Sequence, residues 1–148
     1  MHKPDLIAHL EALLAEKVSA IQAEIASTLN ARNSDTKSSA GDKHEVGRAM
    51  IQQELDHQEA QLAKLHALRQ ELARVPLDRV YDHVAFGGLV TTDQGSYFVA
   101  IGLGQVEVNG EHCFAVSLAS PIGQALKDMQ VGNVVSFNGR SLLLKSIA

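Results

Sequence analysis

The sequence has one cysteine and no tryptophan. No apolar run approaches the length of a membrane span. The single cysteine, Cys113, excludes an intramolecular disulfide, which suits a reducing compartment. It falls in an apolar strand pattern, so we expect a buried, inert thiol, because apolar surroundings disfavour the thiolate. The first residues, Met-His-Lys-Pro, are not typical of a signal peptide. We therefore expect a cytoplasmic protein with no membrane contact.

The sequence also has no excess of positive charge. The formal net charge is −4. Residues 1–76 carry nine Lys and Arg against eleven Asp and Glu, and residues 77–148 carry four against six. Neither half offers the basic surface that non-specific duplex binding requires. We expect nucleic acid to be met only through another protein that binds it.

Motifs of a self-contained active site are missing as well. None of the seven histidines has HExxH spacing or pairs with cysteine at zinc-finger spacing. No serine lies in a G-x-S-x-G context. Gly102-Leu103-Gly104 is too poor in glycine, and wrongly placed relative to a helix, for a phosphate loop. We expect no cofactor and no metal site that the chain builds alone.

Two long helical patterns are present in residues 1–76, the first after a capping Asp5. Apolar residues recur at steps of three and four, which is typical of a coiled-coil seam. The first seam is Ile7, Leu10, Leu14, Val18, Ile21, Ile25 and Thr28, and the second is Ile51, Leu55, Gln58, Leu62, Leu65, Arg69 and Leu72. Either helix alone would be marginal in water, so the two are expected to pair as an antiparallel hairpin. The polar Gln58 and Arg69 are expected to fix its register.

Residues 33–48 connect the two helices and form the expected tip of the hairpin. Three carboxylates stand there among four basic residues: Asp35, Asp42 and Glu45 among Arg32, Lys37, Lys43 and Arg48. Asp42 and Glu45 are three apart, on one side of a helix start. Such a pair can complete the coordination of Mg²⁺ whose other ligands lie elsewhere. The alternative is helix capping by acidic residues in a first turn, and the spacing alone favours that alternative.

Residues 77–148 follow the Val75-Pro76 break and read as a small β domain. The expected strands are residues 84–91, 96–103, 105–108, 111–118, 134–137 and 140–147. Asn109-Gly110 and Asn138-Gly139 predict hairpin turns, because a type I′ turn needs positive φ twice. Ser120 as the N-cap, followed by Pro121 at the first helical position, predicts one short helix. The fold class is α+β: an N-terminal antiparallel coiled-coil hairpin, then a small antiparallel β domain with one helix.

Residues 116–135 resemble a known family. They read Val-Ser-Leu-Ala-Ser-Pro-Ile-Gly-Gln-Ala-Leu, then Val-Gly-Asn-Val-Val from Val131. This is similar to the Ser-Pro-helix-Ala-Leu and Gly-Asp-x-Val runs of the Gre-type transcription elongation factors of bacteria, whose C-terminal domain is FKBP-like. The resemblance implies polymerase docking through Ser120 and Pro121. Ala119 departs from the polar residue often found before that serine, and Asn133 replaces the usual aspartate.

The same resemblance implies a monomer that binds bacterial RNA polymerase and inserts the hairpin tip in its secondary channel. In cleaving members, two tip carboxylates help to hold a Mg²⁺ ion shared with the polymerase and activate water for hydrolysis of backtracked RNA. The polymerase active site catalyses that cleavage, so this chain is expected to be an accessory factor and not an enzyme.

The tip departs from the family's Asp-Leu-x-Glu-Asn-Ala-Glu-Tyr. Residues 35–42 read Asp-Thr-Lys-Ser-Ser-Ala-Gly-Asp, with Ser38 in place of the second carboxylate. Asp42 and Glu45 are then the substitutes, although four basic residues against three acidic ones from Ala31 to Arg48 weaken cation capture. We therefore expect the chain to bind the polymerase and either to stimulate cleavage or only to modulate the active centre.

Two other classes of function remain open. One is a peptidyl-prolyl isomerase or chaperone built on the FKBP-like domain, although strand parity places most of the domain's aromatics in the core. The other is a coiled-coil adaptor whose hairpin pairs with another protein, which a dimer through the helices would support.

Overall fold

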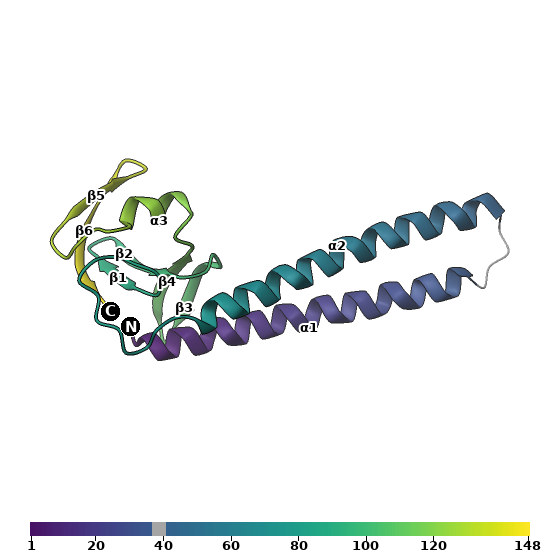
Figure 1. Ribbon diagram of the computed structural model, residues 1–148, viewed down its shortest axis with the longest axis horizontal. Coiled ribbons are helices and arrows are strands. Elements are labelled where there is room, and N and C mark those ends of the chain that lie inside the picture. The colour runs from purple at the N-terminus through teal and green to yellow at the C-terminus, as the bar shows by residue number, and fades with distance from the viewer. Residues whose placement is uncertain (37–40) are drawn as a thin grey trace. The chain divides into compact units, whose positions relative to one another are not determined.

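A computed structural model describes residues 1–36 and 41–148, without the side chains from Ser34 to Glu45. The chain divides into two compact units, each described by itself below. The first combines Met1–Glu11 with Gln70–Ala148, and the second is Ala12–Arg69. Figure 1 labels the elements in chain order, two long helices before the strands and a short helix. The α+β class predicted from the sequence is confirmed.

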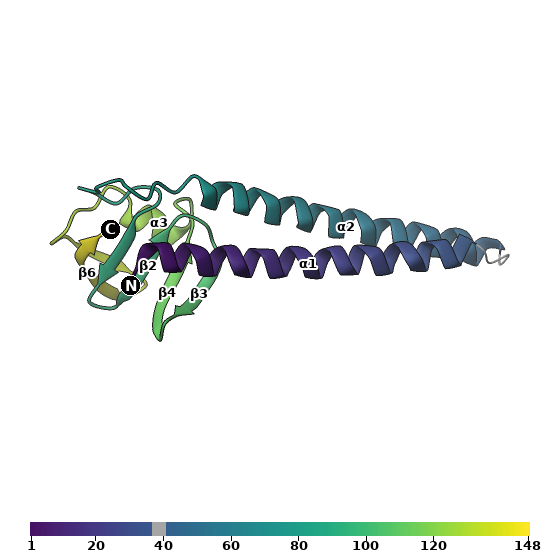
Figure 2. The same ribbon diagram turned by 90° about the horizontal axis from the view of Figure 1, so that it is seen from below.

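The two long helices are α1 (Lys3–Thr36) and α2 (Gly41–Ala73), and they run antiparallel side by side (Figures 1 and 2). Both continue further into residues 33–48 than the polar composition predicts. Helix α1 also begins earlier than predicted, at Lys3, because proline is tolerated in a first helical turn. Asp5 is therefore not the cap: it lies within the first turn, where its carboxylate interacts favourably with the helix dipole.

The predicted seam matches the buried faces of the second unit with one exception. Leu14 and Val18 of α1 and Leu55 of α2 are buried, as the heptad pattern predicts. Arg69 is exposed, so its predicted place in the seam is wrong, and Leu68 is half-buried instead. The next seam residue after Leu65 can be three or four positions on. A step of three places the apolar Leu68 on the inner face, whereas a step of four would expose Leu68 and bury the charge of Arg69.

Gln58 is the polar residue that the seam does bury, with 4% of its surface exposed. Its Nε2 donates to Thr28 Oγ1 across the helix pair at 3.0 Å and to Glu54 Oε1 on its own helix at 3.2 Å. Thr28 Oγ1 in turn donates to the Glu24 carbonyl at 2.9 Å. The Gln58 Oε1 atom is buried, and no described residue donates a hydrogen bond to it. The predicted polar position at Gln58 is therefore confirmed.

The first unit contains one six-stranded sheet and the short helix α3 (Pro121–Leu126). The strands are β1 (Leu89–Thr92), β2 (Gly95–Val99), β3 (Gly104–Val108), β4 (Glu111–Val116), β5 (Val134–Phe137) and β6 (Arg140–Ile147). Their spatial order is β3-β4-β2-β1-β6-β5. All neighbouring pairs are antiparallel except β2 and β4, which run parallel. The sheet is thus mixed and not purely antiparallel as predicted, and two of its pairings, β2 with β4 and β1 with β6, join strands that no hairpin connects.

Both predicted Asn-Gly turns are present, between β3 and β4 and between β5 and β6. Asn109 and Gly110 have φ of 53° and 79°, and Asn138 and Gly139 have φ of 47° and 76°. The strand predicted from residue 84 begins only at Leu89. Gly87 has φ of 86°, which interrupts extended backbone before that point.

One hydrophobic cluster fills the space between α3 and the sheet. Its buried members are Val84, Val90, Val99, Ile122, Leu126, Val135, Leu142 and Leu144. Each apolar side chain of this size contributes about 1.5–3 kcal/mol when fully buried. The cluster therefore fixes α3, and the loop before it, against the strands.

The start of α1 belongs to the same unit as the sheet. Lys3 Nζ donates to the Ala148 carbonyl at 3.2 Å, next to the end of β6, and lies 4.7 Å from the centre of the Tyr81 ring. The Met1 amino group pairs with Glu111 at 3.1 Å. The two ends of the chain accordingly lie close together (Figures 1 and 2).

Candidate functional site

The loop between β4 and α3 contains the residues that the sequence predicts for docking. Ser120 is the N-cap of α3, with extended backbone (φ −67°, ψ 160°), as predicted. Its Oγ accepts from the Gly123 N–H at 3.1 Å and donates to the Ser117 carbonyl at 2.6 Å. One hydroxyl thus joins the first turn of the helix to the loop that precedes it.

Further contacts hold the same loop. The Ser120 N–H donates to the Ser117 carbonyl at 3.2 Å, and Gln124 Nε2 donates to the Leu118 carbonyl at 2.8 Å. Gly123 lies so close that a Cβ built on it would be 2.1 Å from the Ser117 oxygen. Only glycine allows this approach. The loop conformation is therefore fixed by hydrogen bonds and by contact with the helix.

The consecutive residues Ala119, Ser120 and Pro121 differ in their exposure to solvent. Ala119 and Pro121 are exposed, whereas Ser120 is half-buried and its hydroxyl is used within the loop. Ala119 and Pro121 are the surface that a partner can touch, and Ser120 holds them in place. Ser117 and Gly123 were not predicted from the sequence. Glycine destabilises a helix relative to alanine, so a glycine within the predicted helix could have indicated that a close contact requires it at position 123.

The Asn133 position, where the Gre-type pattern has aspartate, forms a turn before β5. Asn133 Oδ1 accepts from the Gln130 N–H at 2.8 Å, and the Asn133 carbonyl accepts from the Leu144 N–H at 3.0 Å. Gly132 beside it has φ of 91°. Asparagine and aspartate both offer a side-chain oxygen for this bond. The substitution therefore preserves the acceptor on which the turn depends.

The structure describes only part of the predicted tip. The side chains of Asp35, Lys37, Asp42, Lys43 and Glu45 lie outside the described residues. Of the remaining predicted tip residues, Arg32 is half-buried and Arg48 is exposed. No group of His, Cys, Asp and Glu able to hold a metal ion occurs among the described residues. The shared Mg²⁺ site at the tip stays a prediction.

Most of the aromatic residues of residues 77–148 are buried or pack against the core. Phe98 and Tyr81 are buried, but Phe114 is exposed, and Tyr97 and Phe137 are only half-buried. The Tyr97 and Phe114 rings stack with centres 5.5 Å apart and planes 22° apart. A hollow of about 260 Å³ is lined by Tyr97, Phe137, Asn138, Arg140 and Leu142. Tyr97 and Phe137 pack against the core cluster, so the expectation that most aromatics are core residues is confirmed, with Phe114 as the exposed exception.

Cys113 is fully buried, as the sequence predicts, and burial raises the pKa of its thiol to about 11. A thiol of that pKa is protonated at neutral pH and is a poor nucleophile. In the part of the chain that the structure describes, no helix is both long and apolar enough to cross a membrane.

No protein-family model matches the chain. No curated protein matches it. A solved structure, "Structure of the transcription factor Gfh1.", is 18% identical over 91% of this chain and 89% of its own, with a TM-score of 0.36. A likeness at that level does not establish function, since one fold serves many functions.

Proposed function

We propose that this protein is a transcription elongation factor-like regulator that binds bacterial RNA polymerase through the β4–α3 loop and inserts the tip of its helical hairpin in the secondary channel. The observation that carries the proposal is the fixed loop that exposes Ala119 and Pro121 within the stretch that resembles the Gre-type docking loop. A loop that is ordered before binding loses little entropy when it docks.

The role of the hairpin follows from its form. Two paired helices of more than thirty residues each end within residues 33–48, at the predicted turn, and those residues carry six charged side chains. A helix rises about 1.5 Å per residue, so the paired helices hold that turn tens of ångströms from their other end. Charged groups at such a turn act on a site that belongs to another molecule.

In this proposal Asp42 and Glu45 are the carboxylates that act with a Mg²⁺ ion of the polymerase, Asp35 is the further candidate, and the nearby basic residues meet nucleic acid held by the polymerase. The polymerase active site performs any cleavage, and this chain modulates it. We further propose that the protein is a monomer with an FKBP-like C-terminal domain.

Docking is tested by titrating core RNA polymerase with the fluorescently labelled protein. We expect saturable binding that Ala119→Lys weakens at least about tenfold, because the change places a charge on the contact surface. Ser136→Lys on β5, at another exposed position of the same domain, is the matched control and should bind like the wild type. Absence of any association with core polymerase would remove the proposal.

The tip is tested on a backtracked elongation complex. If the protein stimulates cleavage, Asp42→Asn and Glu45→Gln should each abolish the stimulation without changing the affinity for polymerase. Glu59→Gln, an exposed carboxylate on α2 outside the tip, is the control. Binding without any stimulated cleavage assigns the protein to modulation of the active centre instead.

A second candidate function, prolyl isomerisation or chaperoning, is favoured by the aromatic hollow at Tyr97 and Phe137. Isomerisation of a short proline peptide is the direct test. Strong activity that Phe137→Ala removes, together with no polymerase binding, would favour this candidate over the first.

A further inference from the structure

A groove runs between α1 and α2 within the second unit, away from the helix ends at Thr36 and Gly41. Its volume is about 350 Å³, and seven side chains line it: Lys17, Ala20, Ile21, Gln61, Lys64, Leu65 and Leu68. The α1 residues are spaced by three and four, and so are the α2 residues, so each set forms one face of its helix. The groove is thus a continuous surface made by both helices.

The floor of the groove is apolar and incompletely covered. Ile21, Leu65 and Leu68 are half-buried, whereas Leu14, Val18 and Leu55 of the same unit are buried. Ala20 has a small side chain that leaves the space between the helices unfilled. The helix pair therefore keeps apolar surface at this level that a further apolar side chain would cover.

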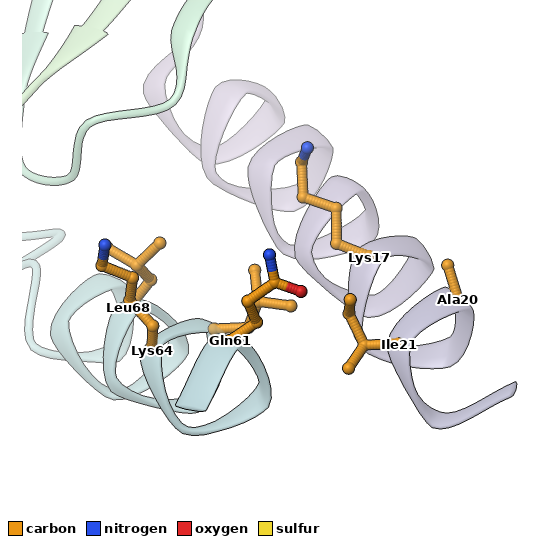
Figure 3. A pocket seen from close by; sticks show the side chains of 7 residues that line it. Lys17, Ala20, Ile21, Gln61, Lys64 and Leu68 are labelled. Carbon is orange, nitrogen blue, oxygen red and sulfur yellow. The ribbon is translucent and has the colours of Figure 1, made fainter. Parts of the chain in front are cut away.

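The rim of the groove is basic on both sides. Lys17 on α1 and Lys64 on α2 are exposed, and neither forms an ion pair with another described residue. Figure 3 shows the side chains of Lys17, Lys64 and Gln61 extending from their helices toward the same side of the helix pair. None of the described residues that line the groove is acidic. An occupant that places carboxylates on both sides of an apolar ridge would match it in charge and in shape.

We propose that this groove docks an acidic amphipathic helical segment of a partner protein, with apolar side chains over Ile21, Leu65 and Leu68 and carboxylates at Lys17 and Lys64. A nucleic acid strand fits less well, because the lining has no aromatic ring on which a base could stack. Residues 12–69 also carry seven Lys and Arg against eight Asp and Glu, so the unit as a whole does not attract a polyanion.

The probe for the test is a synthetic helical peptide of about 18 residues with leucine along one face and glutamate on both sides of it. The matched peptide has lysine in place of every glutamate. Binding of each peptide to the full chain is measured by fluorescence anisotropy at low salt and again at about 0.3 M salt, where surface charges are more strongly screened. The oligomeric state of the protein is measured by sedimentation in the same buffers.

We expect the acidic peptide to bind at least about tenfold more tightly than the basic one, with affinity that falls as salt rises. The double variant Lys17→Glu/Lys64→Glu should lose that affinity and prefer the basic peptide. Arg69→Glu, an exposed basic residue of α2 that does not line the groove, should bind within about twofold of the wild type. Ala20→Leu, which fills the floor, should weaken binding of the acidic peptide at both salt concentrations.

Three results of the peptide measurements would overturn the proposal. These are no binding of the acidic peptide up to about 1 mM, equal binding of both peptides, or an unchanged preference in the double variant. Self-association through the same groove, lost in the double variant, would also overturn it in favour of a second copy of the chain. Circular dichroism of each variant excludes unfolding, because the two lysines are exposed and their replacement buries nothing.

Discussion

Gln58 Nε2 lies 3.0 Å from Thr28 Oγ1, so the helix pair of the second unit is joined by a hydrogen bond across its own seam. The other amide atom, Gln58 Oε1, is buried, and no described residue donates a hydrogen bond to it. Such a group costs roughly 1–3 kcal/mol of desolvation that no bond returns. The position therefore favours one register of the two helices at some expense of stability.

Replacement of Gln58 by leucine should raise the free energy of unfolding by about 1 kcal/mol, because the unpaired oxygen disappears and an apolar side chain is buried. Thr28 Oγ1 keeps the Glu24 carbonyl as its acceptor. Urea unfolding measures the change. Gln53→Leu, at an exposed position of α2, should stay within about 0.5 kcal/mol of the wild type. A clear loss of stability in Gln58→Leu would show that the hydrogen bond outweighs the unpaired oxygen.

Ser120→Ala should lower the free energy of unfolding by about 1 kcal/mol, because the cap of α3 and the bond to the Ser117 carbonyl are lost together. Ser120→Thr keeps a hydroxyl at the same place and should recover most of the loss. Ser136→Ala on β5 is the control for removal of an exposed hydroxyl. Equal stability of the Ser120→Ala and Ser136→Ala variants in urea would contradict the capping role.

Gly123→Ala should cost more than about 2 kcal/mol, because the new Cβ would stand 2.1 Å from the Ser117 carbonyl oxygen and the loop would have to move. Gly102→Ala is a close comparison: its Cβ would meet nothing nearer than the Ser117 N–H, at 4.0 Å. That change should be neutral or slightly stabilising. Thermal unfolding of both variants separates close contact at Gly123 from a general effect of replacing glycine.

The buried thiol of Cys113 makes stability depend on pH on the alkaline side. Its pKa is raised to about 11 in the folded chain from an ordinary value of 9.0. The folded state therefore holds the thiol proton more tightly than the unfolded state. The resulting stability is present below pH 9 and is lost as the pH rises toward 11.

Between pH 8 and pH 10 the thiol should account for a decrease of about 1 kcal/mol in the free energy of unfolding. Cys113→Ala should lack this part of the decrease, and the difference between the two proteins isolates it from the other groups that titrate there. The same thiol should react slowly with a disulfide reagent in buffer and quickly in urea. Rapid labelling of the folded protein would contradict the burial.

Much of the fold follows from patterns that are local in the sequence. The helix pair can be predicted from apolar spacing, because steps of three and four place the apolar side chains on one face of each helix, and that face must be buried. The turns at Asn109-Gly110 and Asn138-Gly139 follow because few other dipeptides adopt positive φ twice. The N-cap at Ser120 follows from its position before Pro121.

What the sequence did not predict depends on contacts between distant residues. The parallel pairing of Tyr97 with Phe114 joins strands that no hairpin connects. Arg69 and Leu68 both fit a helical pattern, and only the position of the facing helix decides which is turned inward. At the candidate site, Ser120 and Pro121 were found from a motif, whereas the contact of Gly123 with the Ser117 carbonyl depends on how α3 lies against the loop.

The bond from Lys3 to the Ala148 carbonyl has a consequence for the order of folding during synthesis. Met1–Glu11 belongs to the unit that is completed by Gln70–Ala148, so this unit cannot close until β6 has left the ribosome. The segment Ala12–Arg69 is continuous and can pair its helices much earlier. During synthesis, the first residues of α1 therefore lack their contacts with the sheet at a time when the helices of Ala12–Arg69 can already be paired.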